Sequence, residues 1–170
     1  KISKVSTPEK FKKIFYKNNY KFFKNNLNDT KKIYKILIKY KPDYIVNFAA
    51  ESHVDRSIDN PIYFIKNNVN SAVNLFHAYN KYYKSKKIKL FHISTDEVYG
   101  SIENGESKEY DVYNPSSPYS ASKSCGDLIA TSFNKTFGSE IKTLYLTNNY
   151  GPYQFPEKFI PTLVLSFLRN

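Results

Sequence analysis

The sequence predicts an α/β protein built on a doubly wound parallel sheet that is incomplete at both ends. Three short apolar runs have the length and the β-branched and aromatic content of buried strands. Between these runs lie longer stretches in which apolar residues return every three or four positions, as on one face of a helix. Such alternation implies right-handed crossovers and a parallel sheet that helices cover on both faces.

The expected elements alternate regularly along the chain. The main strands are expected at residues 43–50, 89–95 and 142–147, and the helices at residues 30–40, 61–84 and 120–137. A further short strand is expected at residues 20–23, before the first crossover. Residues 100–117, which contain glycines and serines, are expected to form a surface loop.

Polar clusters follow the three main strands, at residues 49–52, 94–97 and 148–151. Ligands of open parallel sheets bind beyond the carboxyl ends of the strands, so these clusters predict one shared site. No G-x-G-x-x-G phosphate turn occurs in the 170 residues, and the first residue is Lys1 rather than Met. We therefore expect the beginning of the fold to precede Lys1.

The composition sets broad limits on the function. The formal net charge is +11, but the lysines are spread over helical surfaces rich in asparagine and tyrosine, so we discount binding to nucleic acid or to a membrane. No apolar run approaches the roughly 18 residues that a membrane span requires. The single cysteine, Cys125, cannot form an internal disulfide, and we expect a reducing, cytoplasmic setting.

Tyr119 and Lys123 stand four residues apart at a predicted helix start, so both side chains emerge from one face. A neighbouring ammonium lowers the pKa of a phenol, which would make Tyr119 a base near neutral pH. The alternative is an exposed tyrosine beside a solvated lysine. Spacing alone does not separate the two interpretations, because both residue types are abundant here.

Asp96 and Glu97 follow a predicted buried strand and the hydroxyl of Thr95. Two adjacent carboxyl groups can divide acid and base roles if their surroundings separate their pKa values. The alternative is a capping box formed by Ser94 and Glu97, in which the glutamate only closes a helix start.

The three histidines do not suggest a metal site. His53 lies in a polar string after a strand, whereas His77 falls in a helix and His92 inside a strand. We expect no metal, a core or supporting role for His92, and a packing role for Cys125.

Four strings together carry a resemblance to a known family: AAESHVDRSI at 49–58, HISTDEVYG at 92–100, PSSPYSASK at 115–123 and NNYGPYQFPEKFIP at 148–161. They resemble the extended short-chain dehydrogenase/reductase superfamily and, within it, the dTDP-glucose 4,6-dehydratases. Sugar 4-epimerases share the Tyr-x-x-x-Lys pair but do not normally carry the adjacent Asp-Glu. The resemblance implies an NAD-dependent lyase that oxidises C4 of the sugar, eliminates water across C5 and C6, and returns hydride to C6.

The resemblance also implies a role for each catalytic residue. Tyr119 would take the proton of the 4-hydroxyl group, and Lys123 would lower the pKa of that tyrosine and bind the nicotinamide ribose. Thr95 would hydrogen-bond the sugar near its 4-oxygen. Asp96 would protonate the departing 6-hydroxyl group, and Glu97 would take the C5 proton.

The remaining implied contacts concern NAD and the nucleotide sugar. The cofactor contacts, in addition to Tyr119 and Lys123, are Asn26, Leu27, Phe48, Ala49, Ala50, Ser52, Asn67 and Asn149. The substrate contacts are Ser52, Thr95, Asn148, Lys158 and Phe159. Relatives usually have Asp-Ile where this chain has Asn26-Leu27, commonly Thr at position 67, and Leu at position 159.

By the same resemblance, residues 1–170 form a partial NAD-binding Rossmann-like domain, and residues 150–170 lead into a truncated nucleotide-sugar-binding region. A homodimer is expected through the two long helices, and the 170 residues alone are expected to be inactive. A UDP-sugar 4,6-dehydratase or a nucleotide-sugar 4-epimerase remains an alternative, as does a noncatalytic module that binds nucleotides or nucleic acid.

Overall fold

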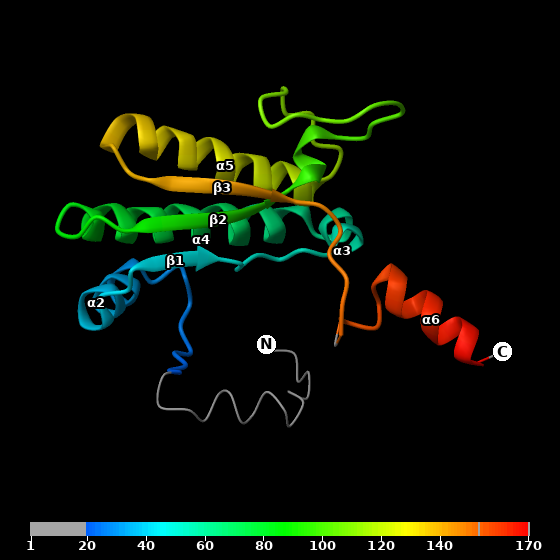
Figure 1. Cartoon of the computed structure of the whole chain (residues 1–170), viewed down its shortest axis with the longest axis horizontal. Coiled ribbons are helices and arrows are strands. Elements are labelled where there is room, and N and C mark those ends of the chain that lie inside the picture. The colour runs from blue at the N-terminus through cyan, green and yellow to red at the C-terminus, as the bar shows by residue number, and fades with distance from the viewer. Residues whose placement is uncertain (1–19, 153, 170) are drawn as a thin grey trace.

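The computed structural model describes residues 20–152 and 154–169 as an α/β fold with a parallel sheet, which confirms the predicted fold class (Figure 1). The helices are α2 (Thr30–Tyr40), α3 (Val54–Asp59), α4 (Pro61–Tyr83), η1 (a 3-10 helix, Asp96–Tyr99), α5 (Pro118–Phe137) and α6 (Phe159–Arg169). The strands are β1 (Tyr44–Asn47), β2 (Lys89–Thr95) and β3 (Ile141–Leu146). No helix in these ranges has the length and apolar content needed to cross a bilayer.

The described strands form one sheet in the order β1-β2-β3, with both neighbouring pairs parallel. In register, Asn47 pairs with His92, and Thr95 pairs with Leu146. All three strands end on the side where α3, η1 and the segment leading to α6 lie (Figure 1). The polar clusters that follow the strands therefore share one edge, as predicted.

Local sequence signals account for the helix ends. The Asn60 side chain accepts a hydrogen bond from the Tyr63 N–H, and Pro61 begins α4 where its missing N–H costs nothing. Ser117 closes a capping box with Ser120, so α5 begins earlier than the expected residue 120. Gly138 ends this helix at φ 65°, a left-handed conformation that glycine adopts readily.

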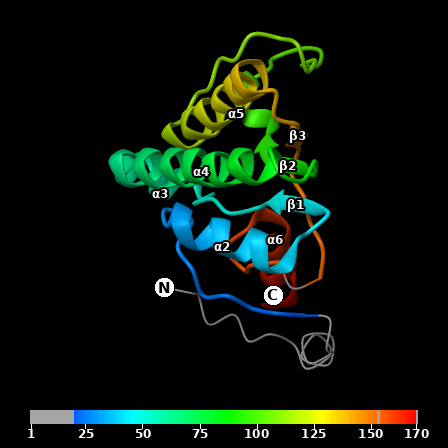
Figure 2. The same ribbon diagram turned by 90° about the vertical axis from the view of Figure 1, so that its left-hand side faces the viewer.

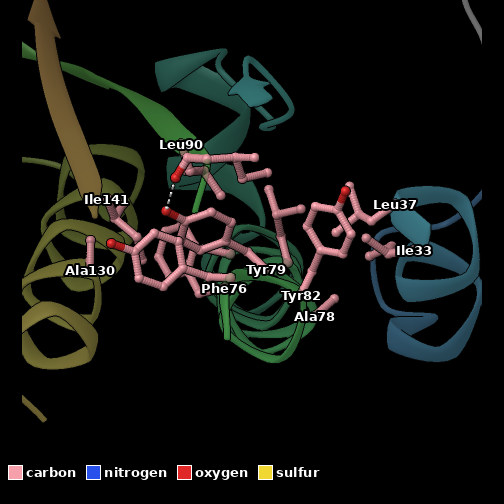
Figure 3. Packing of buried hydrophobic residues seen from close by; sticks show 13 residues of the cluster. Ile33, Leu37, Phe76, Ala78, Tyr79, Tyr82, Leu90, Ala130 and Ile141 are labelled. Atoms are coloured by element: carbon pink, nitrogen blue, oxygen red, sulfur yellow. Dashed lines mark hydrogen bonds between the residues drawn. The ribbon is translucent and has the colours of Figure 1, made fainter. Parts of the chain in front are cut away.

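The core lies between the sheet and α4, and it extends to α2 on one side and α5 on the other (Figure 3). Phe76, Tyr79 and Leu90 are fully buried at its centre. The Tyr79 hydroxyl donates to the carbonyls of Ile88 and Glu140, at 2.8 and 3.0 Å, and so joins the residues that lead into β2 and β3. Aromatic side chains thus both fill the core and hold its strands together.

Among the described residues, α4 and α5 cover one face of the sheet (Figure 2), and Tyr44, Val46 and Leu144 are exposed on the other face. Two expectations about the strands are wrong. The strand expected at 43–50 ends at Asn47, because the following residues turn away toward α3. Residues 20–23 form no strand, since apolar content without a hydrogen-bonded neighbour does not make one.

Candidate active site

Helix α5 places Tyr119 and Lys123 against the carboxyl end of β2. Both residues are buried, at 9% and 6% exposure, so neither is the solvated surface residue of the alternative interpretation. The Lys123 Nζ donates a hydrogen bond to the Ile93 carbonyl at 2.5 Å, and Ser57 in α3 accepts one from the Tyr119 N–H at 3.1 Å. Contacts with β2 and α3 therefore fix the start of this helix.

Burial is the largest influence on the pKa values of Tyr119 and Lys123. Burial raises the pKa of Tyr119 to about 12, the Glu97 charge adds to this shift, and only a hydrogen bond from Thr95 opposes it clearly. The Lys123 ammonium group is directed to the Ile93 carbonyl, and its expected effect on the pKa of the tyrosine stays a prediction. Burial in turn lowers the pKa of Lys123, against the opposing charge of Asp127.

Thr95, Asp96 and Glu97 lie where β2 ends and η1 begins. The Thr95 hydroxyl accepts a hydrogen bond from the Glu97 N–H at 3.3 Å and lies 3.2 Å from Asp96 Oδ1. Thr95 therefore caps η1, and the capping box of Ser94 and Glu97 does not form. The Ser94 hydroxyl instead donates to Asp127 at 2.5 Å. The Glu97 carboxyl group is therefore not used in a capping box, and the Asp96 carboxyl group accepts from Thr95.

The two carboxyl groups have different surroundings. Asp96 is exposed, whereas Glu97 is half-buried. Burial raises the pKa of Glu97, the adjacent Asp96 charge raises it further, and the Lys158 ammonium lowers it. A raised pKa makes the Glu97 carboxylate a stronger base wherever it is ionised.

Asp96 and Glu97 line a cavity of about 440 Å³. Its lining also contains two aromatic residues, Tyr99 and Tyr145. The Tyr145 hydroxyl lies 2.5 Å from the hydroxyl of Tyr113, so the loop before α5 is tied to β3 at a residue that lines this cavity.

A second cavity of about 230 Å³ lies on the segment after β3. It is lined by four of the predicted contact residues: Asn148, Asn149, Lys158 and Phe159. Because the Lys158 charge acts on Glu97, this segment lies near the carboxyl pair. An ion pair at 3.1 Å between Arg56 in α3 and Glu157 holds the segment in place.

The predicted cofactor residues lie apart from one another along the strand ends. Phe48 is 71% exposed just beyond β1. Ala49, Ala50 and Ser52 follow it before α3, and Asn67 lies in α4. Asn26 lines a cavity of about 510 Å³ at the start of α2, whereas the side chain of Leu27 packs against the core. The structure thus brings the catalytic residues together but spreads the cofactor residues over an elongated edge.

Several supporting residues were not predicted. Asn68 in α4 accepts from the Glu51 N–H at 2.8 Å and donates to the Glu51 carbonyl and to Ser122 Oγ, which joins the segment after β1 to α5. It is a polar residue on the buried, otherwise largely apolar face of a helix, and that position was the available signal. Asp127 is 1% exposed on α5, but the buried face of that helix is rich in serine, so the same signal does not mark it.

The remaining expectations divide. His92 is buried, as expected, but Cys125 is exposed and so does not pack in the core. Leu128, also on α5, is 61% exposed. Within residues 20–152 and 154–169, no three His, Cys, Asp or Glu side chains gather closely enough to hold a metal ion.

Known proteins resemble this chain over most of its length. The sequence profile of the GDP-mannose 4,6 dehydratase family matches residues 2–170. A probable dTDP-glucose 4,6-dehydratase of Sinorhizobium fredii is 40% identical over 157 residues, which are 88% of this chain and 45% of that protein. The chain spans about half the length of the curated relatives it matches.

Solved structures show the same fold. The dTDP-glucose 4,6-dehydratase DesIV of Streptomyces venezuelae, with NAD and TYD bound, superposes with a TM-score of 0.86 at 36% identity, over 96% of this chain and 49% of that one. A UDP-N-acetylglucosamine 4-epimerase of Methanobrevibacter ruminantium M1 superposes with a TM-score of 0.78 at 30% identity, over 89% of this chain and 48% of that one. The fold is thus shared by dehydratases and epimerases, and the two must be separated by their site residues.

Proposed function

The chain belongs to the GDP-mannose 4,6 dehydratase family, and from this we propose that the full-length protein dehydrates dTDP-glucose to dTDP-4-keto-6-deoxyglucose with the help of NAD. The observation that carries the proposal is the position of Asp96 and Glu97 beside the Thr95 and Tyr119 hydroxyls. An epimerase needs a base at the 4-hydroxyl group but no acid and base for an elimination.

The residues at the strand ends fit a dinucleotide. An exposed aromatic ring at Phe48, a buried ammonium at Lys123 and the hydroxyl of Tyr119 suit the rings and ribose hydroxyls of NAD. When bound, NAD would accept hydride from C4 of the sugar and later supply it to C6. Asn26, Asn149 and the backbone of residues 48–52 would hold the remainder of the cofactor.

For the oxidation, Tyr119 Oη would take the proton of the 4-hydroxyl group. Because its pKa is raised, the Tyr119 phenol is protonated in the chain without ligand. Ligand binding must therefore lower this pKa before Tyr119 can act as a base. Thr95, which hydrogen-bonds to Tyr119, would hold the 4-oxygen at that position. Lys123 would contribute its positive charge once its ammonium group turns from Ile93 toward the ligand.

For the elimination, the new C4 carbonyl makes the C5 proton acidic, because the carbanion is stabilised as an enolate. Glu97 would take that proton, a role that its raised pKa favours. Asp96 would donate a proton to the departing 6-hydroxyl group. Lys158, together with Asn148, Phe159 and Ser52, would bind the nucleotide sugar.

The wider assembly is part of the same proposal. The described residues would form part of an NAD-binding domain, and residues 150–170 would lead into a nucleotide-sugar-binding region. Exposed apolar side chains on α4 and α5, among them Ile62, Ile65 and Leu128, support a homodimer through these helices. A cytoplasmic location is proposed as the setting, with Cys125 as a free thiol.

The full-length protein should be incubated with dTDP-glucose and, separately, with UDP-glucose, and the products assayed for the 4-keto-6-deoxy sugar. We expect this product from dTDP-glucose. Product from UDP-glucose alone would indicate a UDP-sugar dehydratase, and galactose configuration without water loss would indicate an epimerase. Salt-sensitive binding to generic DNA with no sugar turnover would favour the noncatalytic module.

A further inference from the structure

A chain of buried polar groups runs behind the site, from the end of β1 to α5. The Ala49 N–H donates to Asn47 Oδ1 at 3.2 Å, and Asn47 Nδ2 lies 3.1 Å from His92 Nδ1. Because a backbone N–H can only donate, the amide oxygen of Asn47 must face Ala49 and its NH₂ group must face the imidazole. His92 Nδ1 therefore accepts, and the imidazole proton resides on Nε2.

The protonated nitrogen of His92 faces a carboxylate. His92 Nε2 lies 3.6 Å from Asp127 Oδ1, and Asp127 Oδ2 accepts a hydrogen bond from Ser94 Oγ at 2.5 Å. Burial lowers the pKa of His92 to about 3, so the imidazole is neutral. Gly126 permits this approach, since a Cβ at that position would lie 3.1 Å from Nε2.

The positive charge of Lys123 acts on Asp127. The two residues lie four positions apart on α5 and are 1% and 6% exposed. The Asp127 charge raises the pKa of Lys123 against the effect of burial, and the Lys123 charge lowers the pKa of Asp127, which burial and its neighbours leave at about 6. The Asp127 charge also raises the pKa values of four phenols: Tyr99 in η1, Tyr113 in the loop, Tyr119 in α5 and Tyr145 in β3.

We propose that Asp127 is a positioning residue for the reaction: it is the buried counter-charge that keeps Lys123 protonated, and the Ser94 hydroxyl holds it in place beside His92. This inference rests on the proposed function, because it gives Lys123 a charge that the cofactor site uses. It adds a role for Asn47, His92, Ser94 and Asp127, none of which would touch substrate or NAD. The strand end that would bind the cofactor is thereby coupled to the helix that carries Tyr119 and Lys123.

A purely structural role for Asp127 predicts a different result. Loss of the residue would then reduce stability but would leave the pKa of Lys123 unchanged. Since removal of a neighbouring anion disfavours a cation, loss of a counter-charge must lower the pKa of Lys123. For any step that needs the Lys123 ammonium group, the alkaline limb of the pH profile would then move to lower pH.

The test uses the full-length protein with Asp127→Asn, which keeps the shape of the side chain and removes its charge. NAD affinity by calorimetry and the rate of C4 oxidation are measured from pH 6 to pH 10. We expect the alkaline limb of both profiles to move toward lower pH by about one unit. Ser124→Ala is the matched control, because it alters a buried, uncharged hydrogen bond on the same helix and should leave both limbs in place.

A folded Asp127→Asn protein with unchanged alkaline limbs would overturn the proposal. If Asp127→Asn folds too poorly for kinetics, the variant that also carries Lys123→Met is compared with it by thermal unfolding. We expect the double variant to recover folded protein, because no buried charge is left unpaired. A double variant as unstable as the single one would equally refute the counter-charge. The thermal unfolding measurement depends on neither substrate nor cofactor. If the protein proves to be an epimerase, the proposed reaction is wrong, but this test of the counter-charge remains valid.

Discussion

The two halves of the ligand edge are built differently. Thr95, Tyr119 and Lys123 are each less than 10% exposed and are held by hydrogen bonds to η1, α3 and β2. Asn148 and Asn149, on the segment after β3, are exposed, and Asn149 bonds only to neighbours along the chain, the Thr147 carbonyl and Gln154. Helix α6 has no buried residue among its described side chains. Packing within this chain thus organises the chemistry, whereas it leaves the binding segment open.

The largest effect on activity is expected when the 170-residue chain is assayed in place of the full-length protein. The binding segment has no cover in the described residues, and the cofactor contacts are spread over the edge. We therefore expect the 170-residue chain to show no turnover of dTDP-glucose in an assay for the 4-keto-6-deoxy product, with the full-length protein as control. Measurable turnover by the 170 residues would show that the open half binds without further support.

In the organised half, Tyr119→Phe should reduce C4 oxidation by about 10²–10⁴-fold, the range typical of a lost proton-transfer group. The measurement is the rate of cofactor reduction in the full-length protein. Tyr110→Phe is a suitable control, since that phenol is 80% exposed on the surface loop. An equal loss in both variants would mean that tyrosine removal acts through the fold.

Stability should separate the two halves as well. Phe76→Ala removes a fully buried ring and should lower the free energy of unfolding by about 3–5 kcal/mol. Phe167→Ala in α6 removes a ring that is 75% exposed and should change it by less than about 0.5 kcal/mol in the 170-residue chain. Chemical denaturation measures both. Comparable losses would contradict the view that α6 lies outside the packed core.

The contact between the halves should appear as a smaller pH effect. Lys158 lowers the pKa of Glu97, so Lys158→Ala should raise it, and Glu97 would lose its negative charge at a higher pH. Because a base must be ionised, the acid limb of the elimination rate should move to higher pH. Lys142→Ala, on an exposed position of β3, is the control. An unchanged acid limb would show that Lys158, on the binding segment, does not influence the ionisation of Glu97.

What could be predicted from the sequence follows the same division. Apolar periodicity predicts the strands and long helices, and the spacing of Tyr119 and Lys123 predicts that they share a face, because these are local properties. The prediction of a strand at residues 20–23 was wrong, because a strand needs hydrogen bonds to a second strand that lies elsewhere in the chain. Cys125 was expected to be a packing residue, but it is exposed on α5.

The electrostatics were the least predictable part. The sequence predicts that Lys123 shares a face with Tyr119, but it does not show that the ammonium binds a carbonyl of β2 or that burial is the largest influence on both pKa values. Asp127 was missed because its partners, Ser94 and His92, lie more than 30 positions away in the sequence. Such partners follow from the register of the sheet against α5, which no local pattern encodes.

The central claim is that Tyr119 serves the oxidation while Asp96 and Glu97 serve the elimination. Full-length Asp96→Asn and Glu97→Gln proteins should be mixed with dTDP-glucose while the absorbance of the reduced cofactor and the 4-keto-6-deoxy product are followed together. We predict that reduced cofactor still forms in both variants and that product formation is lost. Loss of both signals to the same extent would contradict this division of roles.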